Sequence, residues 1–192
     1  MSGFQSPLKV FAAGEDPMTT SAPSGQIQGS LDGGIYEGAT KAELNRKADV
    51  SGRCVAAGAT LTLTEATHEG KIICLDTAAG SVVTLPAWAG TGGVYEFLVT
   101  VTATSNSHVI KVANATDEFR GFVVQDSDTA TAPNIWWAAD NDDTITLNRS
   151  TSGLAAQGEK FRIVDAPGGN WIVEGFSQAS GVEITPFSAT VS

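Results

Sequence analysis

From residue 60 onward, apolar residues recur at every second position, which is the spacing of a β-strand with one buried face. In 60–64 two leucines alternate with three threonines, and Tyr95, Phe97 and Val99 alternate with a second set that includes Glu96 and Thr100. The same spacing, or a short apolar run, returns at 72–75, 82–85, 109–112, 119–124, 135–137, 145–147, 161–163 and 171–173. The pattern predicts about ten strands and an all-β fold.

The spacing of these runs favours antiparallel pairing. Turn residues separate the runs, among them GTGG at 90–93 and PGGN at 167–170, and no interval holds a series of crossover helices. We therefore expect an antiparallel β-sandwich or barrel-like domain of the jelly-roll or tulip type over 58–192.

Residues 1–57 differ in composition from the rest of the chain. Three prolines lie among Gly, Ser and Thr, and large apolar residues are sparse, so we expect an extended N-terminal arm rather than a second core. Thr40 and Glu43 fit a capping box for a short helix over about 41–48. A small apolar group stands in the arm, at Phe4, Leu8, Val10 and Phe11. This group suits docking on a neighbouring subunit, and an undocked terminus is the alternative.

The charge of the chain limits its partners. The 21 acidic residues outnumber the 11 basic ones, for a net charge of −10. Such a surface repels nucleic-acid backbones and anionic membranes, so neither is an expected partner. We find neither a signal-peptide pattern nor an apolar run long enough to span a bilayer, and we expect synthesis in the cytoplasm.

Sequence motifs do not indicate catalysis. The chain lacks a G-x-S-x-G elbow, an H-E-x-x-H pair and a dinucleotide fingerprint, so we expect no enzyme and no cofactor. Ser107 and His108 are the nearest candidates for a nucleophile and a base, but neighbours on a strand point to opposite faces. Cys54 and Cys74 are expected to be free, buried structural thiols, because a chain made without a secretory signal stays in a reducing compartment. A zinc site is the alternative, and it would need both cysteines and both histidines, His68 and His108, to converge.

Two further clusters have a functional and a structural interpretation. The acidic run 140–143, with Asp126 and Asp128 upstream, supplies calcium-type oxygen ligands, but it lacks the glycine and glutamate of an EF-hand loop, so we expect a solvated loop and no metal. Trp136 and Trp137 are adjacent, so a strand directs them to opposite sides. One is expected in the core, and the other at an interface or against the arm.

Six segments of the chain resemble structural proteins of tailed bacteriophages. They are VTLP at 83–86, VYEF at 94–97, TSNSHVIKV at 104–112, DTITLN at 143–148, GNWIV at 169–173 and TPFSAT at 185–190. The resemblance covers about 60–192 and leaves the arm outside.

Within that family the chain is most similar to capsid decoration, or cement, proteins. The resemblance implies a β-domain that forms a homotrimer, binds the major capsid protein on the outer surface of the assembled head and stabilises the head. It implies no catalytic residues. A tail-fibre or other tail-associated protein that binds a host surface or glycan is the alternative.

Overall fold

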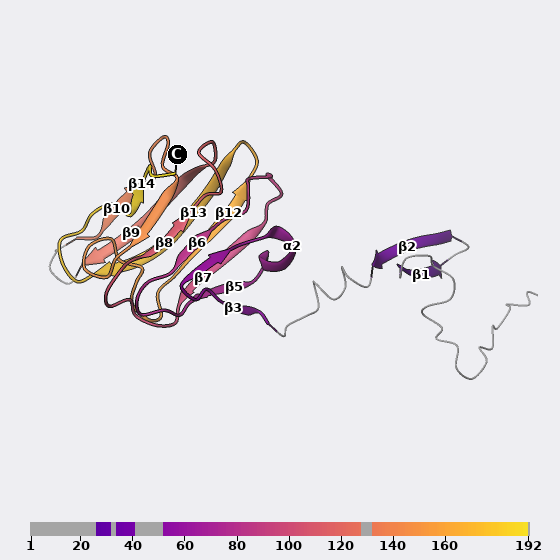
Figure 1. The fold of residues 1–192 in the computed structure, drawn as a ribbon. Helices are drawn as coiled ribbons and strands as arrows, with labels where there is room; N and C mark the ends of the chain where they lie inside the picture. The colour runs from indigo at the N-terminus through magenta and orange to yellow at the C-terminus, as the bar shows by residue number, and fades with distance from the viewer. Residues whose placement is uncertain (1–25, 32–33, 41–51, 128–131, 192) are drawn as a thin grey trace, which may run out of the picture. The chain divides into compact units, whose positions relative to one another are not determined.

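A computed structural model describes residues 26–31, 34–40, 52–127 and 132–191 of the chain. The chain divides into two compact units, Met1–Gly52 and Arg53–Ser192. In the first unit, β1 (Gln26–Leu31) and β2 (Gly34–Thr40) form an antiparallel pair (Figure 1). No strand was predicted there, because 26–31 and 34–40 hold few apolar residues at alternate positions. The predicted helix at 41–48 and the apolar residues Phe4, Leu8, Val10 and Phe11 lie outside the described residues.

The second unit is a sandwich of two β-sheets. The seven-stranded sheet has the order β10-β9-β13-β12-β7-β5-β3, and the five-stranded sheet has the order β14-β11-β8-β6-β4. The strands of the first sheet are β3 (Cys54–Ala56), β5 (Ile72–Leu75), β7 (Val94–Val99), β9 (Glu118–Ser127), β10 (Asn134–Trp137), β12 (Lys160–Ala166) and β13 (Asn170–Ala179). Those of the second are β4 (Thr60–Thr62), β6 (Val82–Thr84), β8 (His108–Lys111), β11 (Thr144–Leu147) and β14 (Phe187–Ser188), and one short helix, α2 (Glu65–His68), follows β4. The all-β prediction is confirmed.

Both sheets are mixed, so the prediction of purely antiparallel pairing is wrong. The parallel pairs of the sandwich are β3 with β5, β5 with β7, β4 with β6, β6 with β8, and β9 with β13. From β3 to β8 the chain alternates between the two sheets. After each strand, the chain runs back through a strand of the opposite sheet and then enters the next strand of the first sheet in parallel. A strand of the opposite sheet therefore replaces the crossover helix that usually connects parallel strands. The jelly-roll or tulip subtype stays a prediction.

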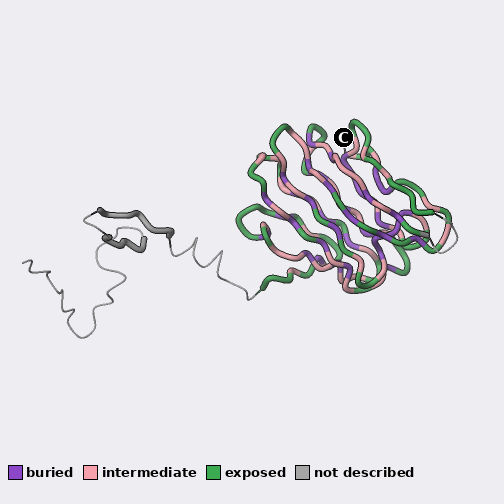
Figure 2. The backbone as a smooth tube through the Cα atoms, turned by 180° about the vertical axis from the view of Figure 1, so that it is seen from behind, coloured by how far each residue is buried: buried purple, intermediate pink, exposed green. Residues whose placement is uncertain are grey.

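The core lies between the two sheets. Along the strands, buried residues alternate with more exposed ones (Figure 2). Trp171, Tyr95 and Phe97 are among the largest side chains with less than 2% exposure, and the rings of Tyr95 and Trp171 meet edge to face at 5.8 Å. Phe97 stacks on Phe161 at 4.7 Å. Burying one such side chain contributes about 1.5–3 kcal/mol to folding. The core residues found among those whose burial is described belong to the second unit.

Strand β3 sets the start of this unit. The sequence analysis placed residues up to 57 in the arm, whereas β3 pairs with β5 and Ala57 is 2% exposed in the core. Three residues are too few to show a period of two, which is why the strand escaped detection.

Candidate interaction surface

The Ser107–His108 pair does not form a catalytic unit. His108 is fully buried, and its Nδ1 accepts a hydrogen bond from the backbone N–H of Ser81 at 3.1 Å. The proton of the neutral ring therefore sits on Nε2. Ser107 Oγ instead accepts a hydrogen bond from the side-chain amide of Asn148 at 3.2 Å. Burial lowers the pKa of His108, partly opposed by the Val101 carbonyl, so this ring is a neutral core residue.

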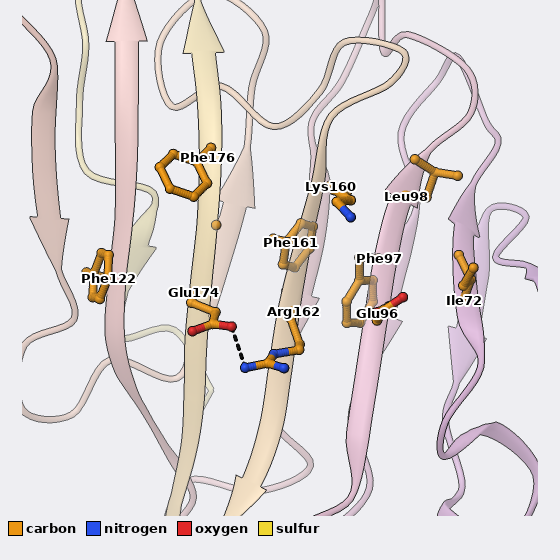
Figure 3. A pocket seen from close by; sticks show the side chains of 11 residues that line it. Ile72, Glu96, Phe97, Leu98, Phe122, Lys160, Phe161, Arg162, Glu174 and Phe176 are labelled. Carbon is orange, nitrogen blue, oxygen red and sulfur yellow. Dashed lines mark ion pairs between the residues drawn. The ribbon is translucent and has the colours of Figure 1, made fainter.

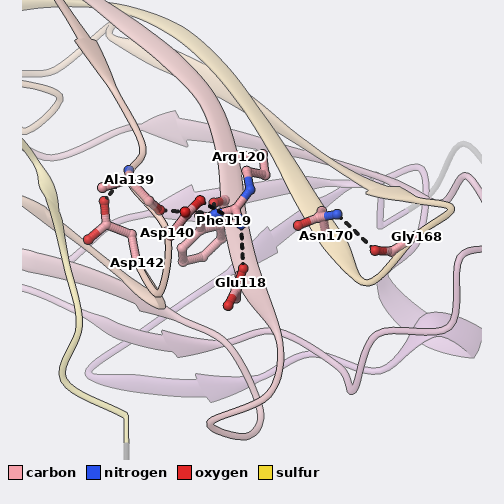
Figure 4. Close-up of polar contacts among 8 residues, drawn as sticks. All are labelled: Glu118, Phe119, Arg120, Ala139, Asp140, Asp142, Gly168 and Asn170. Atoms are coloured by element: carbon pink, nitrogen blue, oxygen red, sulfur yellow. Dashed lines mark hydrogen bonds and ion pairs between the residues drawn. The ribbon is translucent and has the colours of Figure 1, made fainter.

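The acidic residues at 140–143 have separate structural roles. Asp140 forms an ion pair with Arg120 at 3.1 Å, and Asp142 accepts the backbone N–H of Ala139 (Figure 4). Asp143 is buried and accepts the backbone N–H groups of Thr190 and Val191, which fastens the C-terminal segment to β11.

Within the described ranges, no three His, Cys, Asp or Glu side chains come together as metal ligands. Asp128 lies outside these ranges. Asp142 and Asp143 therefore cap a turn and a chain end, as Asx side chains commonly do, while Asp140 pairs with Arg120.

Other buried carboxylates also hold loops. Asp165 accepts hydrogen bonds from the backbone N–H of Gly90 and from both the N–H and the hydroxyl of Thr91. Asp117 accepts the backbone N–H of Trp88 at 2.9 Å. Hydrogen bonds to a buried carboxylate are stronger than neutral ones. These acids stabilise the loops between the sheets.

Both cysteines are free, as predicted. Cys54 is exposed, however, so the expectation that both are buried is wrong for Cys54, which lies on the edge strand β3. Cys74 is partly buried. Burial and a hydrogen bond with Cys54 raise the pKa of Cys74 to about 11, so its thiol is protonated at neutral pH.

The two adjacent tryptophans point to opposite sides of β10. Trp136 packs against the core and donates its indole N–H to Gln125. Trp137 is 67% exposed and lies against Phe122, with 5.0 Å between the ring centroids. Trp137 therefore marks the outer face of the seven-stranded sheet as a surface with large exposed apolar side chains.

The strand register aligns a row of apolar side chains across this outer face. Leu98, Lys160, Phe176, Val124 and Ile135 are successive partners on β7, β12, β13, β9 and β10. Phe176 is 74% exposed and Ile135 is 56% exposed. A sheet face that meets water normally carries polar residues at these alternate positions. In this row only Lys160 is charged.

The neighbouring row places charges at its centre. Its members are, in strand order, Ile72, Glu96, Arg162, Glu174, Phe122 and Trp137. Arg162 thus stands between two glutamates and forms an ion pair with Glu174 (Figure 3). Exposed ion pairs of this kind contribute little to stability, about 0–1 kcal/mol.

A shallow groove of about 690 Å³ runs along these two rows. Ile72 and Leu98 line one side, and Phe122 and Phe176 line the other, with the charged groups between them (Figure 3). From this point, the outer face means the surface formed by the outward residues of these two rows. A groove with apolar walls and a few charged groups at its centre can accept part of a macromolecule or an extended ligand.

The sequence analysis identified Trp137 but missed the rest of the outer face. One signal was present on β13, where Ile172 and Phe176 stand at positions alternate to the core residues Trp171 and Val173. Large apolar residues within the otherwise polar outward set of a strand predict that part of this second face is covered.

Compared with known proteins, the chain matches no family model, no curated protein and no solved structure. Among the described residues, no helix has the length and apolarity needed to span a membrane.

Proposed function

We propose that this chain is a capsid decoration protein of a tailed bacteriophage, a non-catalytic module that binds the outer surface of the assembled head. The observation that supports a module acting through contacts with other molecules is the outer face, with Phe176 74% and Trp137 67% exposed, on a domain whose buried acids and histidine serve packing. Docking on the capsid itself is assigned to the N-terminal segment. The phage context comes from the sequence resemblance at 60–192. The major capsid protein is the proposed partner, and the virion surface is the proposed location.

Such a protein stabilises the head by mass action. It binds the assembled shell and not the separated capsid subunits, so each bound copy favours the shell by RT ln(1 + [L]/Kd). At a free concentration of 100 Kd this is about 2.7 kcal/mol per site. Residues 1–52 are the proposed capsid-docking segment, through Phe4, Leu8, Val10 and Phe11. The net charge of −10 keeps many copies soluble before they bind.

A sedimentation assay with heads that lack the protein tests this proposal. The full chain is expected to co-sediment with heads and to raise their disruption temperature. A chain of residues 53–192 is expected to stay in the supernatant while keeping its β-sheet circular dichroism, because it contains both sheets of the sandwich and the core between them. Failure of the full chain to bind heads would refute the decoration role. Equal binding by residues 53–192 would refute the docking role of the N-terminal segment.

One observation favours a second candidate function, the binding of a host-surface glycan by a tail protein. The exposed Trp137 ring, set against Phe122 at the end of the charged row, offers an apolar platform beside hydrogen-bonding groups. Calorimetric titration with polysaccharide from the host envelope tests it. Binding that is lost in Trp137→Ala and retained in Val182→Ala, an equally solvent-exposed apolar residue off the outer face, would favour the tail role.

A further inference from the structure

We propose that Cys54 and Cys74 form a modification site, at which a low-molecular-weight disulfide oxidises the two thiols to a bond that joins strands β3 and β5. The two strands are neighbours at one edge of the seven-stranded sheet (Figure 1). Both thiols are free in the structure, which is therefore the reduced form of the pair. The proposal goes beyond the decoration role, because the bond depends only on the second unit and on an oxidant.

The register of β3 and β5 places the two cysteines on the same face of the sheet. The strands pair in parallel, with Cys54 opposite Ile72, two residues before Cys74. Opposite residues point to the same side of a sheet, and so do residues two apart on one strand. The alternate residue Ile73 is fully buried in the core. The two cysteine side chains therefore both point away from the core.

The separation of the two thiols suits a bond after a small adjustment. The thiols are close enough to hydrogen-bond with each other. Diagonal neighbours in a sheet have Cα atoms roughly 7–8 Å apart, at the upper limit for a disulfide, so one strand has to shift slightly toward the other. β3 permits this shift, because it is a three-residue strand at the edge of the sheet.

The exposure of the two thiols sets the order of reaction. Cys54 is exposed, so its thiolate reaches a sulfur atom of glutathione disulfide. The disulfide of the small molecule breaks, one glutathione thiolate leaves, and Cys54 carries a mixed disulfide. The thiolate of Cys74 then attacks the sulfur of Cys54, and the second glutathione thiolate leaves. Two protein thiols are thus oxidised, and one glutathione disulfide is reduced to two thiols that take up the two protons.

The pKa of Cys74 makes the second step depend on pH. Burial raises this pKa most, ahead of the hydrogen bond with Cys54, to about 11, so the attacking thiolate is scarce at neutral pH. Burial persists in the mixed disulfide, and the thiolate population grows about tenfold with each pH unit below the pKa. We expect the closure of the mixed disulfide to accelerate by this factor per unit between pH 7 and pH 9.

The bond would secure the start of the second unit. It closes a loop of about 20 residues that contains β4 and α2, and closing such a loop restricts the unfolded chain and so stabilises the fold. The unit begins at Arg53, so the bond also fastens the point at which the N-terminal segment joins the domain. Any benefit of this fastening for head binding rests on the proposed docking role, whereas the bond itself does not.

Incubation of the reduced full chain with glutathione disulfide at pH 8, followed by tryptic mapping without reductant, tests the proposal. Trypsin cleaves after Lys71, which lies between the two cysteines, so they fall in different peptides. We expect peptide 54–71 to be joined to peptide 72–111 in a monomer that has lost two hydrogen atoms. A chain that stops at the mixed disulfide, or that links through Cys54 to a second chain, would overturn the proposal.

Single serine variants are the matched controls. Cys74→Ser is expected to stop at the mixed disulfide on Cys54, and Cys54→Ser is expected to react more slowly than wild type, because Cys74 is partly buried. In the wild-type chain, oxidation is expected to raise the urea midpoint of unfolding by at least about 0.5 M. Dithiothreitol is expected to reverse this shift, and neither serine variant is expected to show it.

The equilibrium of the exchange distinguishes a pair positioned by the fold from two cysteines that are only near in sequence. A bond that stabilises the fold is favoured by the same factor in the folded chain relative to the unfolded chain. The equilibrium constant for closing the bond, titrated against glutathione buffers, is expected to be at least about tenfold higher in native buffer than in urea. An equal or lower constant in native buffer, or oxidation that leaves the urea midpoint unchanged, would refute the proposal.

Discussion

At the scale of single residues, His108 couples folding to pH. Its ring is fully buried and neutral, with Nδ1 accepting the Ser81 N–H. Because burial lowers its pKa in the folded state, the unfolded chain binds the extra proton first as the pH falls. The contribution of a neutral His108 to stability is therefore complete above the unfolded pKa of about 6.5 and is lost progressively below it.

We expect His108→Gln to remove this pH dependence. The variant is less stable than wild type at pH 7.5, and the difference in the free energy of unfolding shrinks toward pH 5, with a slope of at most about 1.4 kcal/mol per pH unit. Urea unfolding of both proteins between pH 5 and 7.5 measures it. A difference that is constant with pH would show that His108 does not titrate on unfolding in this range.

The two thiols are expected to react at different rates. Cys74 has a pKa of about 11 against an ordinary 9.0, so at pH 8 it holds about 100-fold less thiolate than an ordinary cysteine. Iodoacetamide is therefore expected to label exposed Cys54 well before Cys74 in the folded chain, and both alike in urea. Peptide mapping by mass spectrometry distinguishes the sites. Equal labelling rates in the folded chain would contradict the protonated, partly buried state of Cys74.

At the scale of elements, the pairing of β9 with β13 depends on a glycine. Gly121 has φ +103°, and a Cβ there would lie 2.1 Å from the carbonyl oxygen of Val173 on the neighbouring strand. The two strands approach closely only because this position lacks a side chain. The outer face depends on this pairing, since β9 and β13 carry Phe122 and Phe176.

Gly121→Ala is accordingly expected to destabilise the domain by at least about 3 kcal/mol, from clash and strain together. Gly58→Ala is the matched control, because Gly58 also has a positive φ, +57°, but a Cβ there would meet nothing within 4 Å. Its expected cost is about 1–2 kcal/mol. Chemical denaturation measures both, and similar losses in the two variants would refute the close-approach explanation.

The elements themselves were largely predictable from sequence. The run at 72–75 is β5, and the alternation around Tyr95 and Phe97 is β7. Strand pairing was not predictable. Alternation with a period of two shows which face of a strand is buried, but it does not show which strand lies beside it in the sheet. The parallel pairs arise from a chain that alternates between sheets, and this route leaves no local signal. Strands of two or three residues, such as β14 and β3, are too short to show a period.

At the scale of the whole molecule, the candidate site is a product of register. Phe176 comes from β13, Leu98 from β7 and Trp137 from β10, and they share one face only because five strands align them. Sequence reasoning could identify Trp137 as an outward aromatic residue, but it could not assemble the rows. The same alignment balances the charges of the groove in a chain that is otherwise strongly acidic.

The central claim is that this chain decorates the phage head. Immunogold electron microscopy of intact virions, with an antibody raised against residues 53–192, tests it most directly. We expect gold particles distributed over the head at high copy number, with none on virions from a phage that lacks the gene. Gold confined to the tail would contradict the claim. It would favour the second candidate function, in which the outer face, with Trp137 at its end, binds the host surface.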